Sequence, residues 1–277
     1  MLEEMFSYGF MQRAIIAAVM VGLLCSLLSF FVVSNRLSFM GAGISHSMLG
    51  GLALGALTGV TPMYTGGVFA VVVALLVGYI SKYGKMQPDT VIGIFFSGGM
   101  ALGITLISFK EGYYPELFTL LFGNVLTVTF NDIYFLGGVM LVVLFFLLFF
   151  FKELLTISFD EELARANGLP VDYLYLGMLV SLAISVVASV MVVGVVLASA
   201  LLVIPAAAGH RLSNNFRAML VCSLLVGLCS SVGGLVFTFY YDVPSGATIV
   251  LCAAVLFFFS LSFKRLKLFI KESFLIE

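Results

Sequence analysis

Long apolar segments separated by short polar connections dominate the hydrophobic pattern of this chain. Stretches such as 137–151 and 249–259 are apolar at every position, whereas the strands of a membrane barrel alternate apolar and polar side chains. A helix needs about 20 apolar residues to cross the hydrocarbon of a bilayer. The pattern therefore predicts membrane-spanning helices at 12–33, 43–59, 62–81, 89–108, 132–151, 172–190, 191–209, 218–239 and 245–263.

Two of these segments leave the number of spans at eight or nine. Segment 43–59 is short and rich in glycine, and no polar residue separates 172–190 from 191–209.

Composition supports a membrane protein without a separate soluble domain. Hydrophobic residues make up 62% of the 277 positions and charged residues 10%, against roughly 25% charged residues in a soluble domain. Backbone N–H and C=O groups in lipid must be paired within their own segment. We therefore expect an all-α polytopic transmembrane helical bundle, with residues 1–277 forming one transmembrane domain.

The basic residues give these helices a direction. Nine spans with a cytoplasmic C-terminus leave inner connections at 34–42, 82–88, 152–171 and 210–217, plus the tail from Lys264. These segments hold eleven of the 13 Lys and Arg residues and leave Arg13 and Lys110 outside. Cytoplasmic connections carry an excess of Lys and Arg, so we expect the C-terminus in the cytoplasm.

Two connections are long enough to have structure of their own. We expect an outer interfacial segment at about 111–131, because its middle is apolar and its ends are polar. On the inner side we predict a short, solvent-facing helix at about 158–169. Ser158 and Glu161 have capping-box spacing, and Gly168 followed by Pro170 ends the helix. The alternative interpretation of this segment is a solvated connector.

The chain lacks the motifs of several function classes. It has neither a GxxxxGK[ST] loop for nucleotide phosphates nor an HExxH motif, so any ATP must be hydrolysed by another protein. A net charge of −1 without a basic block argues against nucleic-acid binding. The four cysteines lie within apolar runs and form no CxxC pair, which is typical of buried thiols. We expect neither an enzyme nor a stably bound cofactor.

His46 is the clearest ionisable residue inside a predicted span. Such residues are costly in lipid and are therefore candidates for function. Imidazole is a common ligand of zinc and related metals, so His46 is a candidate metal ligand in a translocation path. The alternative is a neutral histidine hydrogen-bonded to a backbone carbonyl, to Ser45 or to Ser47. His210 lies beside Arg211 at a predicted helix end, where an interfacial position fits it better.

Small residues and a proline mark places of close packing or bending. Gly51 and Gly55 form a GxxxG pair, which lets helix backbones approach closely. Packing within the chain and a homodimer seam both fit this pair. Pro205 lies inside a predicted span, where it removes a helix hydrogen bond and favours a kink.

Five further segments carry a family pattern. They are residues 36–46 (RLSFMGAGISH), 89–97 with 101–108 (DTVIGIFFS and ALGITLIS), 159–168 (FDEELARANG), 194–205 (GVVLASALLVIP) and 244–247 (PSGA). In this order they resemble the metal-ion permease family of ATP-binding-cassette (ABC) importers, which serves zinc, manganese and iron, and the match runs nearly end to end.

The resemblance implies both an assembly and a location. It implies a type II-like permease that forms a homodimer in a prokaryotic plasma membrane and works with two copies of a cytosolic ATPase. An extracytoplasmic metal-binding protein would deliver the ion.

The resemblance also suggests roles for individual residues. Segment 159–168 is similar to the coupling element that docks in the ATPase. Its candidate residues are Asp160, Glu161, Glu162, Arg165 and Gly168. His46 matches a histidine thought to contact metal in the family. Many members carry Asp four residues earlier, on the same helix face, where this chain has Ala42.

The missing carboxylate bears on the choice of metal. A path with His46 and no neighbouring carboxylate suits zinc better than manganese, so we expect zinc first, with manganese and iron as alternatives. Two rival classes are the ABC permeases for siderophores and cobalamin, and secondary transporters driven by an ion gradient. The latter usually carry ionisable residues along their path.

Overall fold

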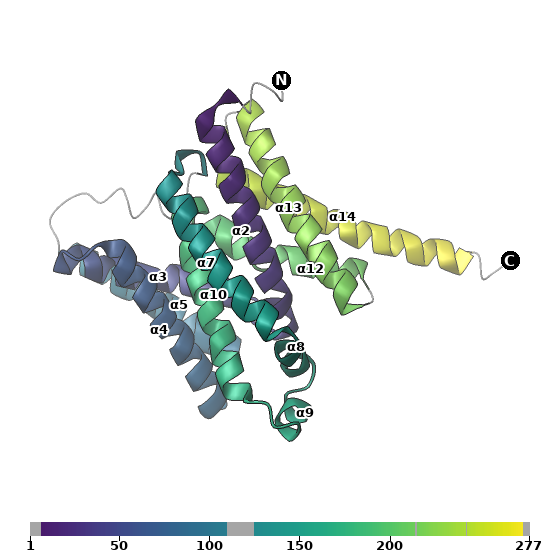
Figure 1. Ribbon diagram of the computed structural model, residues 1–277, viewed down its shortest axis with the longest axis horizontal. Helices are drawn as coiled ribbons and strands as arrows, with labels where there is room; N and C mark the ends of the chain where they lie inside the picture. The colour runs from purple at the N-terminus through teal and green to yellow at the C-terminus, as the bar shows by residue number, and fades with distance from the viewer. Residues whose placement is uncertain (1–6, 110–124, 214, 242, 274–277) are drawn as a thin grey trace.

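The computed structural model describes residues 7–109, 125–213, 215–241 and 243–273, with side chains through residue 262. Within these residues the fold is helical, with one short 3₁₀ helix and no strand (Figure 1). The helices are α2 (Gly9–Ser34), α3 (Met40–Thr58), α4 (Pro62–Tyr83), α5 (Pro88–Ser108), η1 (Val125–Thr127), α7 (Phe130–Phe149), α8 (Phe151–Phe159), α9 (Glu161–Ala166), α10 (Val171–Val193), α11 (Val195–Leu201), α12 (Ile204–Leu212), α13 (Phe216–Tyr241) and α14 (Ser245–Ser273).

The predicted all-α transmembrane architecture is confirmed. Nine helical segments in the described part of the chain are long and apolar enough to span a membrane. Segment 43–59 corresponds to α3, and Gly194 separates α10 from the next span, so both uncertain segments count as spans. The seventh span, Val195–Leu212, consists of α11 and α12 together.

Proline, glycine and capping residues set several of the helix ends. Pro62 and Pro88 occupy the first turns of α4 and α5, where a missing N–H costs no helical hydrogen bond. Gly59 ends α3 in the left-handed conformation, at φ 76°. Thr129 accepts a hydrogen bond from the Asp132 backbone N–H, and the Asp132 carboxylate accepts one from the Thr129 N–H. This reciprocal capping box fixes the start of α7.

The two ends of the bundle differ in their content of Lys and Arg. At one end, called here the α9 end, the last turn of α4, the first turn of α5, α9 and the first turn of α10 line one small cavity. The start of α2 lies at the opposite end (Figure 1). The α9 end carries Arg36, Lys82, Lys85, Lys152 and Arg165, whereas Arg13 lies near the start of α2 at the other. This distribution is the one that the orientation prediction requires.

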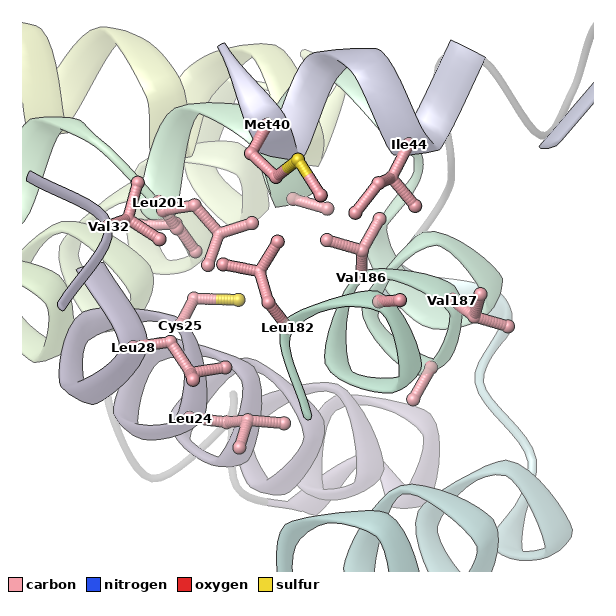
Figure 2. Packing of buried hydrophobic residues seen from close by; sticks show 14 of the residues in the cluster. Leu24, Cys25, Leu28, Val32, Met40, Ile44, Leu182, Val186, Val187 and Leu201 are labelled. Carbon is pink, nitrogen blue, oxygen red and sulfur yellow. The ribbon is translucent and has the colours of Figure 1, made fainter. Parts of the chain in front are cut away.

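The core lies where α2 and α10 meet α3 and α11. Figure 2 shows Leu24 and Leu28 of α2, Ile44 of α3 and Leu182 of α10 converging there. By contrast α4, α5 and α7 turn large apolar side chains outward, for example Val68 at 66% exposed. In water such surfaces would be costly, whereas lipid solvates them.

One sequence prediction is corrected here. The expected kink at Pro205 is a break, because α11 ends at Leu201 and α12 begins at Ile204, with Pro205 in its first turn. Its missing N–H therefore falls where a helix needs none. The predicted last span at 245–263 agrees with the span found at Ser245–Ser262, and its helix continues to Ser273.

The expected outer interfacial segment at 111–131 lies outside the described residues as far as 124. Its remainder forms η1 and the start of α7. Val125 is buried there, and its backbone N–H donates to Ser245 Oγ at the start of α14.

Candidate metal path and coupling helix

His46 lies on α3, six residues after the first residue of that helix. At about 1.5 Å per residue, its Cα is about 9 Å along the axis from the α9 end of the helix. The side chain is half-buried, and its ring centre is 4.7 Å from the ring centre of Phe96 on α5. The α3–α5 contact therefore positions His46 at a partly accessible point inside a spanning segment.

The neighbouring serines do not partner the His46 imidazole. Ser45 Oγ donates to the Gly41 carbonyl at 2.7 Å, and Ser47 Oγ donates to the Ile44 carbonyl at 3.0 Å. His46 Nδ1 is buried and has no hydrogen-bond partner among the described residues. The alternative of a histidine satisfied by Ser45 or Ser47 is therefore wrong. A buried ring nitrogen without a partner is uncommon in folded proteins and calls for an explanation.

One chain supplies a single candidate ligand at this point. Ala42, one turn before His46, is half-buried like His46 but has no donor atom on its side chain. Within the described residues there is no group of three or more His, Cys, Asp or Glu side chains that could hold a metal ion. The arrangement can contact a passing ion but cannot enclose one.

Glycines hold α3 tightly between two other helices. A Cβ at Gly51 would lie 2.5 Å from Phe69 Cβ and 2.8 Å from the Thr65 carbonyl oxygen, both on α4. A Cβ at Gly55 would collide with Thr65 Oγ1. The GxxxG pair is thus occupied by α4 of the same chain, and the alternative of a homodimer seam at Gly51 and Gly55 is wrong.

Helix α3 is equally close to α5. A Cβ at Gly99 would lie 2.5 Å from Ser47 Cα, and one at Gly103 would lie 2.9 Å from the backbone carbon of Leu49. Because backbone meets backbone in both contacts, α3 cannot shift without moving α4 and α5.

A second cavity lies away from His46. It has a volume of about 630 Å³ and lies between α4, α7 and α10 at the end opposite α9. Its walls are mainly apolar, with polar side-chain atoms on Thr61, Tyr64, Asn131 and Asp132, and His46 does not line it. Its lining includes one carboxylate, that of Asp132, and no imidazole. We therefore do not assign the metal path to this cavity on the basis of its size.

The helix predicted at 158–169 is α9, but its cap differs from the prediction. Asp160, not Ser158, caps the helix, because Asp160 Oδ1 accepts a hydrogen bond from the Leu163 N–H at 2.9 Å. Ser158 belongs to α8, donates to the Leu154 carbonyl and accepts from Asn35 Nδ2. Gly168 follows α9 with φ 77° and makes the turn into α10. The predicted capping box at Ser158 is therefore wrong.

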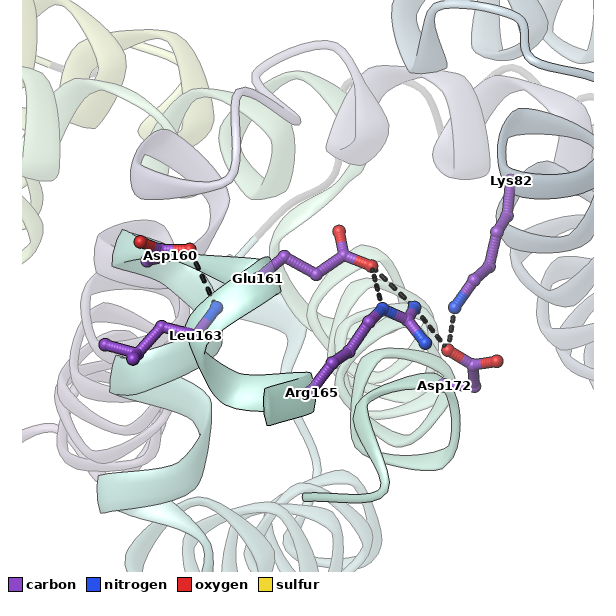
Figure 3. A network of polar contacts seen from close by, with 6 residues as sticks. All are labelled: Lys82, Asp160, Glu161, Leu163, Arg165 and Asp172. Atoms are coloured by element: carbon purple, nitrogen blue, oxygen red, sulfur yellow. Dashed lines mark hydrogen bonds and ion pairs between the residues drawn. The ribbon is translucent and has the colours of Figure 1, made fainter. Parts of the chain in front are cut away.

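Two of the predicted coupling residues turn toward their own chain. Arg165 Nη2 lies 2.6 Å from Glu161 Oε1 and 2.7 Å from Asp172 Oδ1 on α10 (Figure 3). Lys82 Nζ, from the last turn of α4, also binds Asp172 Oδ1. Four charges from three helices thus form one network, with Asp172 at its centre.

Other side chains of this region project away from the bundle. Leu163 is 53% exposed and points away from Arg165 in Figure 3, and Phe159 and Tyr173 are 71% and 81% exposed. Glu162 is exposed as well. The sequence prediction named only charged residues and Gly168 here. The missed signal is the pair of large apolar residues inside the most polar connection, Phe159 and Leu163.

Comparison with known proteins finds similar chains of nearly the same length. The family described as "ABC 3 transport family" matches residues 7–264. The manganese transport system membrane protein MntC of Listeria innocua serovar 6a is 35% identical over 278 residues, covering 100% of this chain and 99% of that protein.

Two further matches cover most of the chain. The chelated iron transport system membrane protein YfeD of Yersinia pestis is 35% identical over 271 residues, covering 96% of this chain and 90% of that protein. The structure of PsaBC from Streptococcus pneumoniae in complex with Fab contains a similar chain. It has a TM-score of 0.81 and 35% identity, and the match covers 94% of this chain and 95% of that chain.

Proposed function

The chain belongs to the ABC 3 transport family, and from this membership we propose that it carries a divalent metal ion through the membrane into the cytoplasm. It is a membrane permease of the metal ABC importer class, and its relatives are transport subunits rather than enzymes. The observation that carries the proposal is His46, a partly accessible imidazole with an unpartnered buried nitrogen inside a spanning helix.

Energy for transport comes from a separate cytosolic ATPase that docks on α9. Exposed apolar side chains next to charges are typical of interface anchors, and Phe159, Glu162 and Leu163 form such a surface. The excess of Lys and Arg at this end supports a cytoplasmic position for α9 and for the C-terminus. Two ATPase copies would serve two permease copies.

The second permease copy packs on the exposed face of α5. Gly93, Ser97, Ala101 and Thr105 recur every four residues on that helix, and all four are exposed. Small residues at this spacing let membrane helices pack closely. Because α5 also carries Phe96, this face would bring two His46 side chains toward a shared path.

The mechanism follows from a site that contacts the ion without enclosing it. An extracytoplasmic metal-binding protein supplies the high-affinity step and releases the ion into the dimer. One imidazole per chain holds the ion only transiently, because a complete ligand shell would trap it. Movement of α9 by the ATPase then opens the path toward the cytoplasm.

Manganese is the cargo that we propose. MntC is named for manganese transport and YfeD for chelated iron, and neither name refers to zinc. The expectation of zinc rests on His46 as a ligand without a carboxylate at position 42. Manganese prefers oxygen ligands, water among them, so an ion that keeps part of its hydration shell can pass a single imidazole. Iron is the second candidate, favoured by the match to YfeD.

Competition in cells separates these metals. A bacterial strain without its own manganese uptake would express the complete importer, and the entry of radioactive manganese would be measured. Unlabelled manganese in excess should reduce entry to background, whereas the same excess of zinc should leave most of it. Zinc competing as strongly as manganese would contradict the proposed cargo. The same strain with an empty vector controls for other routes.

A further inference from the structure

The network around Asp172 is the main polar attachment of α9 to the membrane helices. A single carboxylate oxygen, Asp172 Oδ1, is bound by Arg165 of α9 and by Lys82 of α4. Within α9, Glu161 holds the Arg165 guanidinium through both Nε and Nη2, at 3.2 and 2.6 Å. Asp172 therefore joins α9 to α4 by way of the first turn of α10.

Apolar packing contributes little to this attachment. Ala164 is the one buried residue of α9. A cavity of about 240 Å³ lies beside the network and is lined by Asn35, Ser81, Lys82, Pro88 and Glu161, among others. On the side of this cavity, the ion pairs of Arg165 and Asp172 are the side-chain contacts that the described residues show between α9 and the membrane helices.

Beyond the network, α4 packs closely against α10 and α3. One turn before Lys82, a Cβ at Gly78 would lie 2.5 Å from Leu179 Cδ1 of α10. Closer to the start of α4, Thr65 and Phe69 contact Gly51 of α3. A displacement of the Lys82 end of α4 is therefore passed to α3, the helix that carries His46.

We propose that Asp172 is a positioning residue that ties α9 to α4, so that movement of α9 by the ATPase displaces α4, α3 and His46 as one unit. The inference rests on the proposed function, since it needs an ATPase that acts on α9. It adds a role for Lys82 and Asp172, which lie outside the segment 159–168 that carries the family pattern.

The exposure of the network makes the proposal testable in folded protein. The side chains of Lys82, Asp172 and Arg165 are 26%, 39% and 43% exposed. Ion pairs as exposed as these contribute little to stability. Variants that remove one charge should therefore still fold and assemble with the ATPase.

The experiment uses the complete importer, with its ATPase and delivery protein, reconstituted in lipid vesicles. Manganese uptake and ATP hydrolysis are measured in the same sample, and their ratio is compared between variants. Asp172→Asn should lower the manganese transported per ATP by about fivefold, while ATP hydrolysis and the amount of bound ATPase stay near the wild-type level.

Matched variants distinguish positioning from a structural role. Asp172→Glu should restore most of the ratio, because it keeps the charge. Lys82→Met combined with Asp172→Asn should be no worse than the more affected single variant, because both act through one ion pair. Asp89→Asn removes an exposed carboxylate at the same end, on the first turn of α5, and should leave the ratio unchanged.

Two results would overturn the proposal. One is a wild-type ratio in Asp172→Asn, and the other is a fall that occurs only because the ATPase no longer binds. If the wild-type importer itself shows no ATP-dependent manganese uptake, the proposed function fails instead, so the two failures are distinguishable.

Discussion

At the scale of single residues, His46 is the side chain on which the proposed metal path depends. The hydroxyl groups of both neighbouring serines donate hydrogen bonds to α3 backbone carbonyls. His46 Nδ1 has no hydrogen-bond partner among the described residues, and its ring lies beside the Phe96 ring. A buried polar atom without a partner costs about 1–3 kcal/mol. The proposed contact of the His46 imidazole with the ion would give this unpartnered group a function.

Replacing His46 with Ala tests this role. The variant should lower manganese uptake at least about tenfold, the range in which groups that support a metal ligand act. The amount of assembled complex should not change, because the side chain is only half-buried. His210→Ala is the matched control, since His210 is exposed at the end of α12, and should keep wild-type uptake. Wild-type uptake in His46→Ala would exclude a direct contact with the ion.

The sequence could identify His46 but not its surroundings. One histidine inside a long apolar segment stands out by its cost in lipid. Its ring contact with Phe96 depends on how α3 and α5 pack, 50 positions apart in sequence, and no local pattern encodes that contact. The same limit applies to Arg165, whose charge was visible whereas its turn toward Asp172 was not.

At the scale of helices, α3 is defined by close glycine contacts with two neighbours. Its Gly51 and Gly55 meet α4, and Gly99 and Gly103 of α5 meet α3. The GxxxG pattern of Gly51 and Gly55 was readable in the sequence, but the pattern alone does not choose between a neighbour in the chain and a second copy. The short loop 59–61 between α3 and α4 brings these two helices together and settles the choice.

A methyl group at Gly51 should therefore destabilise the fold. Gly51→Ala would place a Cβ 2.5 Å from Phe69 Cβ, and overpacking of this kind costs about 1–3 kcal/mol. Thermal unfolding in detergent should show a lower midpoint for this variant. Gly138→Ala on α7, where a Cβ would meet nothing within 4 Å, should leave the midpoint unchanged or raise it. Equal midpoints for the two variants would contradict the close contact.

The short helix α9 illustrates a second limit of sequence reasoning. Its existence and its end at Gly168 were predictable from turn chemistry, whereas its start was misplaced by two residues. Ser158 and Asp160 are both good capping residues. Because α8 extends through Phe159, Ser158 lies inside α8 and cannot cap α9. Competition between adjacent helices for one residue is decided by packing, which local spacing does not report.

Truncating Leu163 tests the docking surface on α9. Leu163→Ala should weaken binding of the ATPase at least about fivefold, as loss of an apolar interface anchor does. The measurement is the amount of ATPase that co-purifies with the permease over a range of ATPase concentrations. Tyr64→Ala removes a side chain that is 73% exposed at the opposite end and should not change this binding. Unchanged binding in Leu163→Ala would place the docking surface elsewhere.

At the scale of the whole molecule, the described residues form a helical bundle with a charged end around α9 and an apolar belt. Hydropathy predicted all nine spans because each must satisfy its backbone within lipid. The sequence predicted a kink at Pro205 and not a break. Proline occurs both at kinks within a helix and in the first turn of a new helix, so its position in the sequence does not distinguish the two. The sequence does not single out the small-residue face of α5, because Gly93, Ser97, Ala101 and Thr105 also fit packing within one chain.

A bulky residue on that face should disrupt the proposed dimer. Ala101→Phe places a large ring among the small residues of α5, so two copies could no longer approach closely. Native mass spectrometry of the purified permease should show a shift from dimer to monomer. Val142→Phe, on an α7 position that is 65% exposed, serves as the control and should leave the dimer intact. A dimer that survives Ala101→Phe would place the interface on another helix.

The central claim is that this chain moves metal only as part of an ATP-driven importer. The most direct measurement is manganese uptake into lipid vesicles that contain the purified permease, its ATPase and the delivery protein, with and without ATP. The account predicts uptake that requires ATP and all three components and that His46→Ala suppresses. Uptake by the permease alone, driven by an ion gradient and indifferent to ATP, would contradict it.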